Sequence, residues 1–507
     1  MPKKAGLNLP QEIEVWYVLP AIRKEFAMKM VKKGMKQREI ANKLGITEAA
    51  ISQYIKNKRA SKIKLDEKII KEIDRAVERV LKGSSVLQEI QNVCSFVKRE
   101  GYLCKIHRKY GTPPKKCDIC SCFVETVGDK RIYMDHAATT PVAPEVLEAM
   151  KPFFNDKFGN PNSLHSFGQE AEKVLEECRS RIAKIINASP EEIVFTSGGT
   201  ESDNMALKGI LKSGDHLITS AIEHPAIRET AKHLEDRGIK VTFLPVNKEG
   251  FISIQNLEKA ITKETKLVSI MHANNEIGTI EPIEEIGCIC KKHNILFHTD
   301  AVQSFCKVPI DVRRMNVDLL SASSHKIHGP RGIGLLYTRK GVEITPLMHG
   351  GGQENRKRSG TINVAGVVGF TKAAEIAAGE MKNDRIKKMR NRLIKELLKV
   401  KASWLNGSKE NRLPNNVNMG FDYIEGEALI LRLNDKGIAS STGSACSSKS
   451  LMPSHVLLAI GLNPQKAHGS LRLTLGRNNT EKDVDYVIKS VKEVVEDLRK
   501  ISPLCKQ

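Results

Sequence analysis

The stretch Ser321-Ala-Ser-Ser-His-Lys-Ile-His-Gly-Pro-Arg-Gly-Ile-Gly334 sets one lysine, Lys326, between small hydroxyl residues and a glycine-rich turn. Small neighbours leave room for a bulky ligand close to the backbone. A lysine held there can lose its proton and form a Schiff base with an aldehyde cofactor such as pyridoxal phosphate. A lysine on a solvated helix face is the alternative that this stretch leaves open, and the remaining sequence decides between them.

Three further polar sites each accompany a predicted strand. Residues 196–202 are small and lie between the strand at 193–195 and a helix, where backbone N–H groups and the helix dipole can bind an anion. Asp300 ends another strand and could contact a pyridine nitrogen, and the imidazole of His224 could stack on an aromatic ring. Each one alone is equally compatible with a structural role. From Tyr133 onward strand and helix signals alternate, which predicts an α/β fold with a mainly parallel sheet.

These sites belong to a longer series of motifs. The series reads YMDHAATTP (133–141), GNPNS (159–163), TSGGTESDN (196–204), EHP (223–225), NNEIG (274–278), HTDAVQ (298–303), SSHKIHGPRGIG (323–334), RSGT (358–361) and SACSS (444–448). It closely resembles the cysteine desulfurases of the NifS/IscS type, in the class-V aminotransferase family of fold-type I pyridoxal phosphate enzymes. The resemblance implies a large domain over residues 131–400, ending in a long helix from 367, and a smaller α+β domain over 401–507 that includes residues 131–145.

The resemblance also implies a role for each motif residue. Lys326 would hold the cofactor and then remove the α-proton of the substrate, while Asp300 would keep the pyridine nitrogen protonated. His224 would stack over the ring and shuttle protons. Arg472, assisted by Asn160, would bind the substrate carboxylate. The remaining cofactor contacts would come from Gly199, Thr200, Asn275, Gln303, Ser323 and His325, and from Thr361 of the partner subunit in a homodimer.

Cys446 separates this family from other enzymes of the same fold. It lies in residues 440–450, a small polar stretch without apolar periodicity that should be mobile and exposed. As a thiolate it could attack the sulfur of cofactor-bound L-cysteine, leaving an enzyme persulfide and, after further steps, alanine. The resemblance implies that an acceptor such as an iron–sulfur scaffold protein then takes the sulfur. In one departure from the family, Asn355 and Arg356 replace an Arg-Gly pair, which bears on loop geometry and dimer contacts.

Two other functions fit parts of the sequence. A selenocysteine lyase or another β-eliminating pyridoxal phosphate enzyme would use the same cofactor site, although Cys446 argues against simple elimination. A transcription regulator could use the module only to sense a ligand, although an intact set of Lys326, Asp300 and His224 argues against a retired enzyme.

The positive charge of the chain is concentrated near its beginning. The formal net charge is +22, and residues 1–130 hold 28 Lys+Arg against 15 Asp+Glu. A basic N-terminal quarter indicates an anionic partner for that region. No apolar run approaches the roughly 18 residues of a membrane span, and the first residues lack a signal-peptide core. The sequence therefore predicts a cytoplasmic protein with no membrane partner.

Residues 1–62 predict a helix-turn-helix domain. Helices are expected at 22–33 and 36–44, Gly45 supplies a turn, and Thr47 caps a third helix with inward residues Ala50, Ile51 and Ile55. The pattern resembles helix-turn-helix domains of the Cro/repressor type. That resemblance implies major-groove contacts from Thr47, Glu48, Ala49, Ser52 and Gln53. A helical dimerisation or docking module with a basic surface is the alternative.

Residues 63–126 predict a helical region with a cysteine-rich site. The Cys117-Asp-Ile-Cys120 knuckle can bind one metal from a single turn, and distant cysteines can complete the four ligands of zinc or an iron–sulfur cluster. Free thiols in a helical cap are the alternative. The favoured set is Cys94, Cys104, Cys117 and Cys120, with Cys122 as a substitute. This region resembles archaeal-type regulators that pair a helix-turn-helix with a small cysteine cluster.

Overall fold

The computed structural model describes residues 13–56, 58, 60, 63–110, 131–442 and 453–502. The chain divides near residue 131 into an N-terminal unit and a C-terminal unit. Within these residues no helix combines the length and the apolar character that a bilayer crossing requires.

The N-terminal unit is helical throughout its described residues, as predicted. Its side chains pack into one apolar core, to which Phe26, Ile51, Ile73 and Val93 all belong. Its elements are a π-helical turn (Glu14–Val18), α2 (Leu19–Lys32), α3 (Gln37–Leu44), α4 (Glu48–Ile55), α5 (Glu67–Leu81), α6 (Val86–Arg99) and α7 (Tyr102–Tyr110).

The turn between α3 and α4 follows the predicted chemistry with one correction. Gly45 ends α3 in the left-handed region (φ +62°), and the Thr47 hydroxyl accepts a hydrogen bond from Ala50 N at 3.2 Å. Tyr54 is buried at 2% exposure, whereas Ile55, predicted to face inward, is 38% exposed. At about 100° per residue, Tyr54 lies between Ala50 and Ile51 on the buried face, and Ile55 lies about a quarter turn from Tyr54, beyond Ile51.

The C-terminal unit is built on a seven-stranded sheet in the order β2-β8-β7-β6-β5-β3-β4. Strand β8 is antiparallel to both of its neighbours and the other pairs are parallel, so the predicted mainly parallel sheet is confirmed. The strands are β2 (Ile193–Thr196), β3 (His216–Ser220), β4 (Lys240–Leu244), β5 (Thr265–Ser269), β6 (Leu296–Asp300), β7 (Leu319–Ser323) and β8 (Gly334–Thr338).

Helices cover both faces of this sheet, because alternate strand residues point to opposite sides. Ile193 and Phe195 of β2 pack into one core, while Val194 packs into the other. The first core also contains residues of α9 (Pro144–Met150), α11 (Ser166–Ile185), α14 (Ile254–Ala260), α15 (Ile283–Lys292) and α16 (Val364–Glu380). The second contains residues of α12 (Gly199–Ile210) and α13 (Pro225–Glu235).

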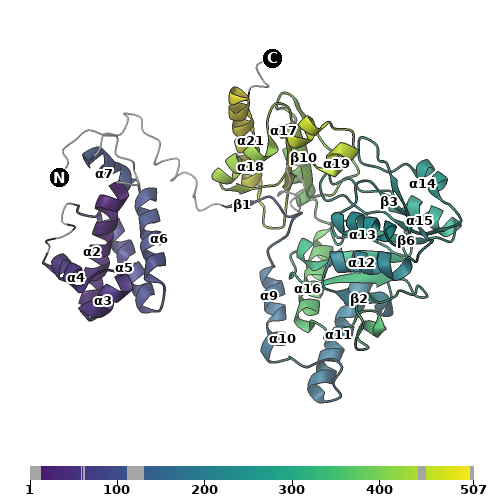
Figure 1. The fold of residues 1–507 in the computed structure, drawn as a ribbon, viewed down its shortest axis with the longest axis horizontal. Helices are drawn as coiled ribbons and strands as arrows, with labels where there is room; N and C mark the ends of the chain where they lie inside the picture. The colour runs from purple at the N-terminus through teal and green to yellow at the C-terminus, as the bar shows by residue number, and fades with distance from the viewer. Residues whose placement is uncertain are drawn as a thin grey trace. The chain divides into compact units, whose positions relative to one another are not determined.

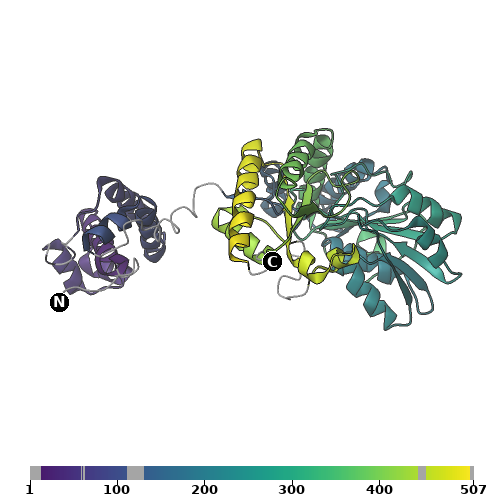
Figure 2. The ribbon, with the colours of Figure 1, turned by 90° about the horizontal axis from the view of Figure 1, so that it is seen from above.

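A smaller antiparallel sheet, β12-β10-β9, forms a separate core with the last helix. Residues 132–133 belong to the part of the unit built around this core, because β1 pairs with β11 and Met134 lies in the core. In Figures 1 and 2, α21, drawn in yellow, lies at one end of this unit and the teal strands and helices lie at the other. The elements are β1 (Ile132–Tyr133), β9 (Ser403–Leu405), β10 (Asn416–Phe421), α18 (Gly426–Asp435), β11 (Ile438–Ala439), α19 (His455–Ala459), α20 (Pro464–His468), β12 (Ser470–Thr474) and α21 (Glu481–Ile501).

The long helix predicted from residue 367 to about 400 is two helices. α16 ends at Glu380, and α17 (Arg385–Leu397) begins after a turn in which the Asn383 side chain accepts a hydrogen bond from Arg385 N at 2.9 Å. Such a local bond offers the backbone an alternative to helix. The buried side chains of α17, including Leu393, belong to the smaller core rather than to the cores of the large sheet. The domain bounds themselves stay a prediction.

Candidate active site

A cavity of about 830 Å³ lies where the parallel strands of the large sheet end. His224 follows β3, Asn275 follows β5, Asp300 ends β6 and Ser323 ends β7. The carboxyl ends of parallel strands meet at one edge of a sheet, which is where α/β proteins bind ligands. Predicted site residues that line this cavity are Gly199, Thr200, His224, Asn275, Asp300, Gln303, Ser323, His325, Lys326 and Arg472.

Lys326 lies in a short 3₁₀ turn directly after β7. Its Nζ donates hydrogen bonds to the carbonyl oxygens of Ala137 at 2.5 Å and Ala138 at 2.7 Å. The glycine at the start of β8 allows the close approach of this strand to Gly198, since a Cβ on Gly334 would come within 2.7 Å of the Gly198 Cα. The strand can therefore approach the start of α12 closely, which brings the helix terminus and the lysine to the same cavity.

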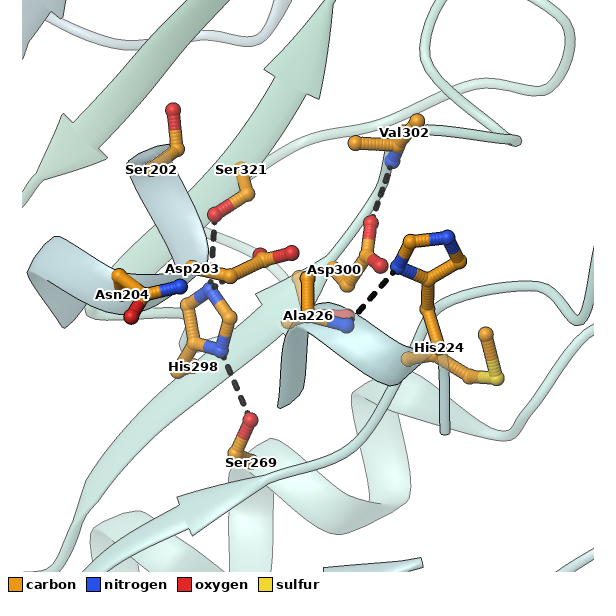
Figure 3. A network of polar contacts seen from close by, with 12 residues as sticks. Ser202, Asp203, Asn204, His224, Ala226, Ser269, His298, Asp300, Val302 and Ser321 are labelled. Carbon is orange, nitrogen blue, oxygen red and sulfur yellow. Dashed lines mark hydrogen bonds and ion pairs between the residues drawn. The ribbon is translucent and has the colours of Figure 1, made fainter. Parts of the chain in front are cut away.

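Asp300 is the buried carboxylate of the cavity, with 5% of its surface exposed. Its Oδ1 accepts a hydrogen bond from Val302 N at 2.8 Å (Figure 3). Burial raises the pKa of Asp300, whereas His224, the Val302 N–H and Lys326 all lower it. Burial is the largest of these effects and leaves the pKa of Asp300 raised, while the charge of Lys326 and the Val302 N–H favour a negative charge at this position.

His224 is the N-cap of α13, and its Nδ1 accepts a hydrogen bond from Ala226 N at 3.1 Å (Figure 3). Burial lowers the pKa of His224, the charge of Asp300 acts in the opposite direction, and Lys326 adds to the lowering. Because Nδ1 is an acceptor, the neutral imidazole carries its proton on Nε2.

Arg472 reaches the cavity from strand β12 of the smaller sheet. Its side chain is 2% exposed and forms an ion pair with Asp135, Nη2 to Oδ1, at 2.9 Å. Its Nη1 donates to the carbonyl oxygen of Asn275 at 3.0 Å. These contacts fix the guanidinium at the cavity wall, where it can meet a carboxylate.

The residues fit pyridoxal phosphate. The twelve-residue helix α12 begins at the cavity with Gly199 and Thr200, and Ser323 and His325 line the same wall, which suits a phosphate. His325 Nδ1 lies 3.1 Å from Thr139 Oγ1, and burial lowers its pKa to about 4. An amine and a buried carboxylate share the same space, as a Schiff base and a pyridine nitrogen require.

Two predicted site residues do not line the cavity. Asn160 is exposed and accepts a hydrogen bond from Asn162 N at 3.1 Å, and Thr361 is exposed. The Asn355–Arg356 departure lies in a short turn, Glu354–Arg356, where the Glu354 carboxylate pairs with Arg179 at 2.8 Å.

Cys446 lies outside the described residues, but one flank of its segment lines the cavity and the other pairs with a residue that lines it. Ser441 pairs through its backbone with Arg472, which lines the cavity. On the other side, His455 also lines the cavity, and its Nε2 lies 3.0 Å from the carbonyl oxygen of Glu223. Ser454 Oγ donates to Glu276 Oε2 at 2.5 Å.

Three buried acids of this region were not predicted. Asp203 and Glu276 line the cavity, and Glu223 lies beneath it, where burial raises its pKa to about 8. All three stand inside motifs of the series, next to predicted site residues. The signal was therefore present, but an acid beside a helix start is also typical of a solvated face.

The predicted DNA-contact residues lie on α4 and its N-cap. Thr47, Glu48, Ala49 and Gln53 are exposed, and Ser52 is half-buried. Side chains on one exposed helix can enter a groove without rearrangement of the core.

The predicted metal ligands have divergent environments. Cys94 is buried among apolar side chains at 4% exposure, and burial raises its pKa to about 11. Cys104 is half-buried beside the same core. Cys117, Cys120 and Cys122 lie outside the described residues. Among the residues that are described, no three His, Cys, Asp or Glu side chains form a group that could hold a metal ion.

Comparison with known proteins assigns the two units. Residues 27–74 match a helix-turn-helix family, and residues 132–487 match the aminotransferase class-V family. Cysteine desulfurase IscS of Dictyoglomus turgidum is 52% identical over 381 residues, 74% of this chain and 97% of that protein. IscS of Methanosarcina thermophila is 53% identical over 394 residues, 76% and 98% of the two chains.

Solved structures agree with these matches. A NifS-like protein, 42% identical, superposes with a TM-score of 0.69 over 73% of this chain and all of its own. A structure described as SspA in complex with cysteine, 41% identical, has a TM-score of 0.62 over 68% of this chain and 99% of its own. The family match, the identity to the relatives and the shared fold show that the chain belongs to the aminotransferase class-V family, among the cysteine desulfurases of the IscS type.

Proposed function

We propose that this protein is a pyridoxal phosphate-dependent cysteine desulfurase that converts L-cysteine to L-alanine and passes the sulfur to Cys446. The observation that carries the proposal is the convergence of Lys326, Asp300, His224 and Arg472 on one cavity from separate elements. The bound cofactor would act as an electron sink for the carbanion formed at the substrate Cα.

The side chains of the cavity divide the remaining work. Arg472 binds the carboxylate of the substrate, and its ion pair with Asp135 fixes its orientation. Lys326 would remove the α-proton, and Asp300 would supply the carboxylate for the pyridine nitrogen of the bound cofactor. His224, with its proton on Nε2, can deliver that proton to the substrate.

The sulfur of the substrate is transferred to Cys446. Attack of the Cys446 thiolate on the substrate Sγ forms an S–S bond and breaks the Cβ–S bond, and protonation of the carbon fragment gives L-alanine. Support comes from the two flanks of its segment: His455 lines the cavity, and Ser441 pairs through its backbone with Arg472, which also lines it. We propose an iron–sulfur scaffold protein as the acceptor of the persulfide sulfur, and a cytoplasmic location stays a prediction.

An assay with L-cysteine and a reductant tests this function by measuring alanine and sulfide. We expect the Cys446→Ala variant to lose both products by about 100-fold or more, as for removal of a nucleophile. Cys288→Ala is the matched control, because Cys288 is an exposed free thiol of the same chain. Equal turnover by Cys446→Ala would instead favour selenocysteine lyase or β-elimination chemistry.

We also propose a homodimer in which Thr361 contacts the cofactor phosphate of the partner subunit. Support comes from exposed apolar side chains at the start of α11: Leu164 is 93% exposed, and the rings of Phe158 and Phe167 lie 5.6 Å apart and are 65% and 51% exposed. Light scattering should give twice the chain mass. A mixture of Thr361→Ala and Lys326→Ala subunits should regain activity that neither variant has, since one of the two mixed sites carries both native residues.

For the N-terminal unit we propose DNA binding through α4. Support comes from the helix-turn-helix match, the exposed residues of α4 and the basic composition. Gln53→Ala should weaken binding to the selected DNA site, and Gln88→Ala, an exposed glutamine on α6, should not. Binding should fall steeply with salt. A protein that binds cysteine and DNA but releases neither alanine nor sulfide would support a regulator instead.

We propose that zinc or an iron–sulfur cluster binds the cysteine-rich segment through Cys104, Cys117, Cys120 and Cys122. The buried position of Cys94 favours Cys122 as the fourth ligand. Metal and sulfide analysis of anaerobically purified protein tests this. We expect Cys94→Ala to retain the metal and Cys120→Ala to lose it.

A further inference from the structure

A second carboxyl group lies beside Asp300 at the back of the cavity. Asp203, on α12, is 1% exposed and lines the cavity. Figure 3 shows it with Asp300 and His298, and the charge of Asp300 acts on it directly. Two buried acids thus line one cavity, where a single unpaired charge is already costly.

His298 does not supply a positive partner. Its Nδ1 lies 2.8 Å from Ser269 Oγ and its Nε2 lies 3.0 Å from Ser321 Oγ, so both ring nitrogens are already hydrogen-bonded to serines (Figure 3). Burial lowers the pKa of His298 to about 3, which leaves the ring neutral. The contact of 3.7 Å between His298 Nε2 and Asp203 Oδ1 is therefore not an ion pair.

The surroundings of Asp203 favour its neutral form. Burial and then the charge of Asp300 raise the pKa of Asp203, the Ser321 hydroxyl lowers it in part, and Glu223 raises it further. Its Oδ1 has no hydrogen-bond partner among the described residues. Asp300 is also buried, but its Oδ1 accepts the Val302 N–H hydrogen bond at 2.8 Å and it shares the cavity with Lys326, and both of these favour its charged form.

We propose that Asp203 is a positioning residue, a neutral carboxylic acid behind the cofactor cavity whose retained proton leaves Asp300 as the charged carboxylate of the pair. Like charges in one buried site cannot both form without a large cost, so the carboxyl group that has Lys326 and a backbone N–H donor for its charge ionises, and the other keeps its proton. If Asp203 were charged instead, Asp300 would take up a proton, and the pyridine nitrogen would lose its charged partner. This consequence for the reaction rests on the proposed function.

Infrared spectroscopy of the full-length protein as purified, at pH 7, tests the proposal. The infrared band of protonated carboxyl groups (their C=O stretch) should lose the intensity of one group in Asp203→Asn relative to wild type. It should lose no intensity in Asp300→Asn. Glu223 and Glu281, with pKa values raised to about 8, contribute the same bands to wild type and to Asp203→Asn and cancel in that difference. A band lost only in Asp300→Asn, or no loss in either variant, would overturn the proposal.

A second measurement follows the cofactor absorbance of the loaded protein against pH. Asn mimics a neutral acid, so the midpoint in Asp203→Asn should stay within about 0.5 of the wild-type value, whereas loss of a charged neighbour would move it by a unit or more. Neither readout requires turnover of cysteine. A failed desulfurase assay therefore leaves this test intact, and a failed infrared test leaves the desulfurase proposal intact.

Discussion

The two units of the chain present their functional residues in opposite ways. On α4, Thr47, Glu48 and Gln53 are exposed, and the apolar core beneath them only has to hold the helix in place. In the C-terminal unit, Asp300 and Arg472 are almost fully buried, and their charges act at low effective dielectric. A substitution in the first unit should therefore change contacts, whereas one in the second should change the ionisation and orientation of its neighbours.

The largest expected effect is at Arg472. Arg472→Gln should lower kcat/KM for L-cysteine by about 10²- to 10³-fold, chiefly through KM, because removing one partner of a buried charge pair costs about 2–5 kcal/mol. Steady-state kinetics with L-cysteine measures it. Asp135→Asn keeps the guanidinium and loses only its ion pair at 2.9 Å, so its loss should be smaller. Equal losses in the two variants would mean that Arg472 acts through the fold rather than on the substrate.

The helix-turn-helix offers a sharper contrast within one helix. Ile51 is fully buried and Ile55 is 38% exposed. Ile51→Ala should destabilise the N-terminal unit by about 2–5 kcal/mol, and Ile55→Ala should change its stability by less than about 0.5 kcal/mol. Amide hydrogen exchange of α3 and α4 in the full-length protein reports this local stability. A large effect at Ile55 would place that side chain in an interface.

How much the sequence could predict follows from the same contrast. Lys326, Asp300 and Thr47 were predictable because each stands in a local pattern with its own chemistry: a glycine-rich turn, a strand end and a helix cap. The burial of Tyr54 rather than Ile55 was not predictable, because the two side chains are adjacent in a short helix and the sequence does not define the centre of its buried face. The break at Asn383 depends on one side chain competing with the helix backbone.

The burial of charged groups was the other feature that the sequence could not predict. Asp203, Glu223 and Glu281 have the residue type of solvated positions, and only the packing of strands and helices around them makes them buried. Whether Thr361 meets a cofactor depends in turn on a second subunit, which a single chain cannot define.

The burial of Glu281 should make the stability of the C-terminal unit depend on pH. Glu281 is 3% exposed, and burial raises its pKa to about 8. The folded protein keeps its proton up to that pH, whereas an unfolded glutamate loses it above about 4.3. Stability should therefore fall as pH rises from about 4.3 to 8. Glu281→Gln should remove the part of this fall that belongs to Glu281, roughly 5 kcal/mol for a pKa displaced from about 4.3 to about 8, and leave the part that belongs to Glu223. Urea denaturation at pH 5 and pH 8 measures both.

The smallest expected effect is at the family departure. Glu354, Asn355 and Arg356 have φ values of 49°, 53° and 63°, in the left-handed region. Arg356 stands where the family commonly has glycine, and its side chain is exposed. Arg356→Gly should relieve about 1–2 kcal/mol of backbone strain, of which the greater freedom of glycine in the unfolded chain offsets about 0.5–1 kcal/mol.

A net stabilisation of about 0.5–1 kcal/mol should remain, measurable by urea denaturation followed at Trp404. Asn355→Gly is the control, because asparagine tolerates the left-handed region better than arginine and should gain less. Destabilisation by Arg356→Gly would mean that the arginine side chain contributes more than its backbone strain costs. In a homodimer, that contribution would come from the partner subunit, since Arg356 is exposed on the single chain.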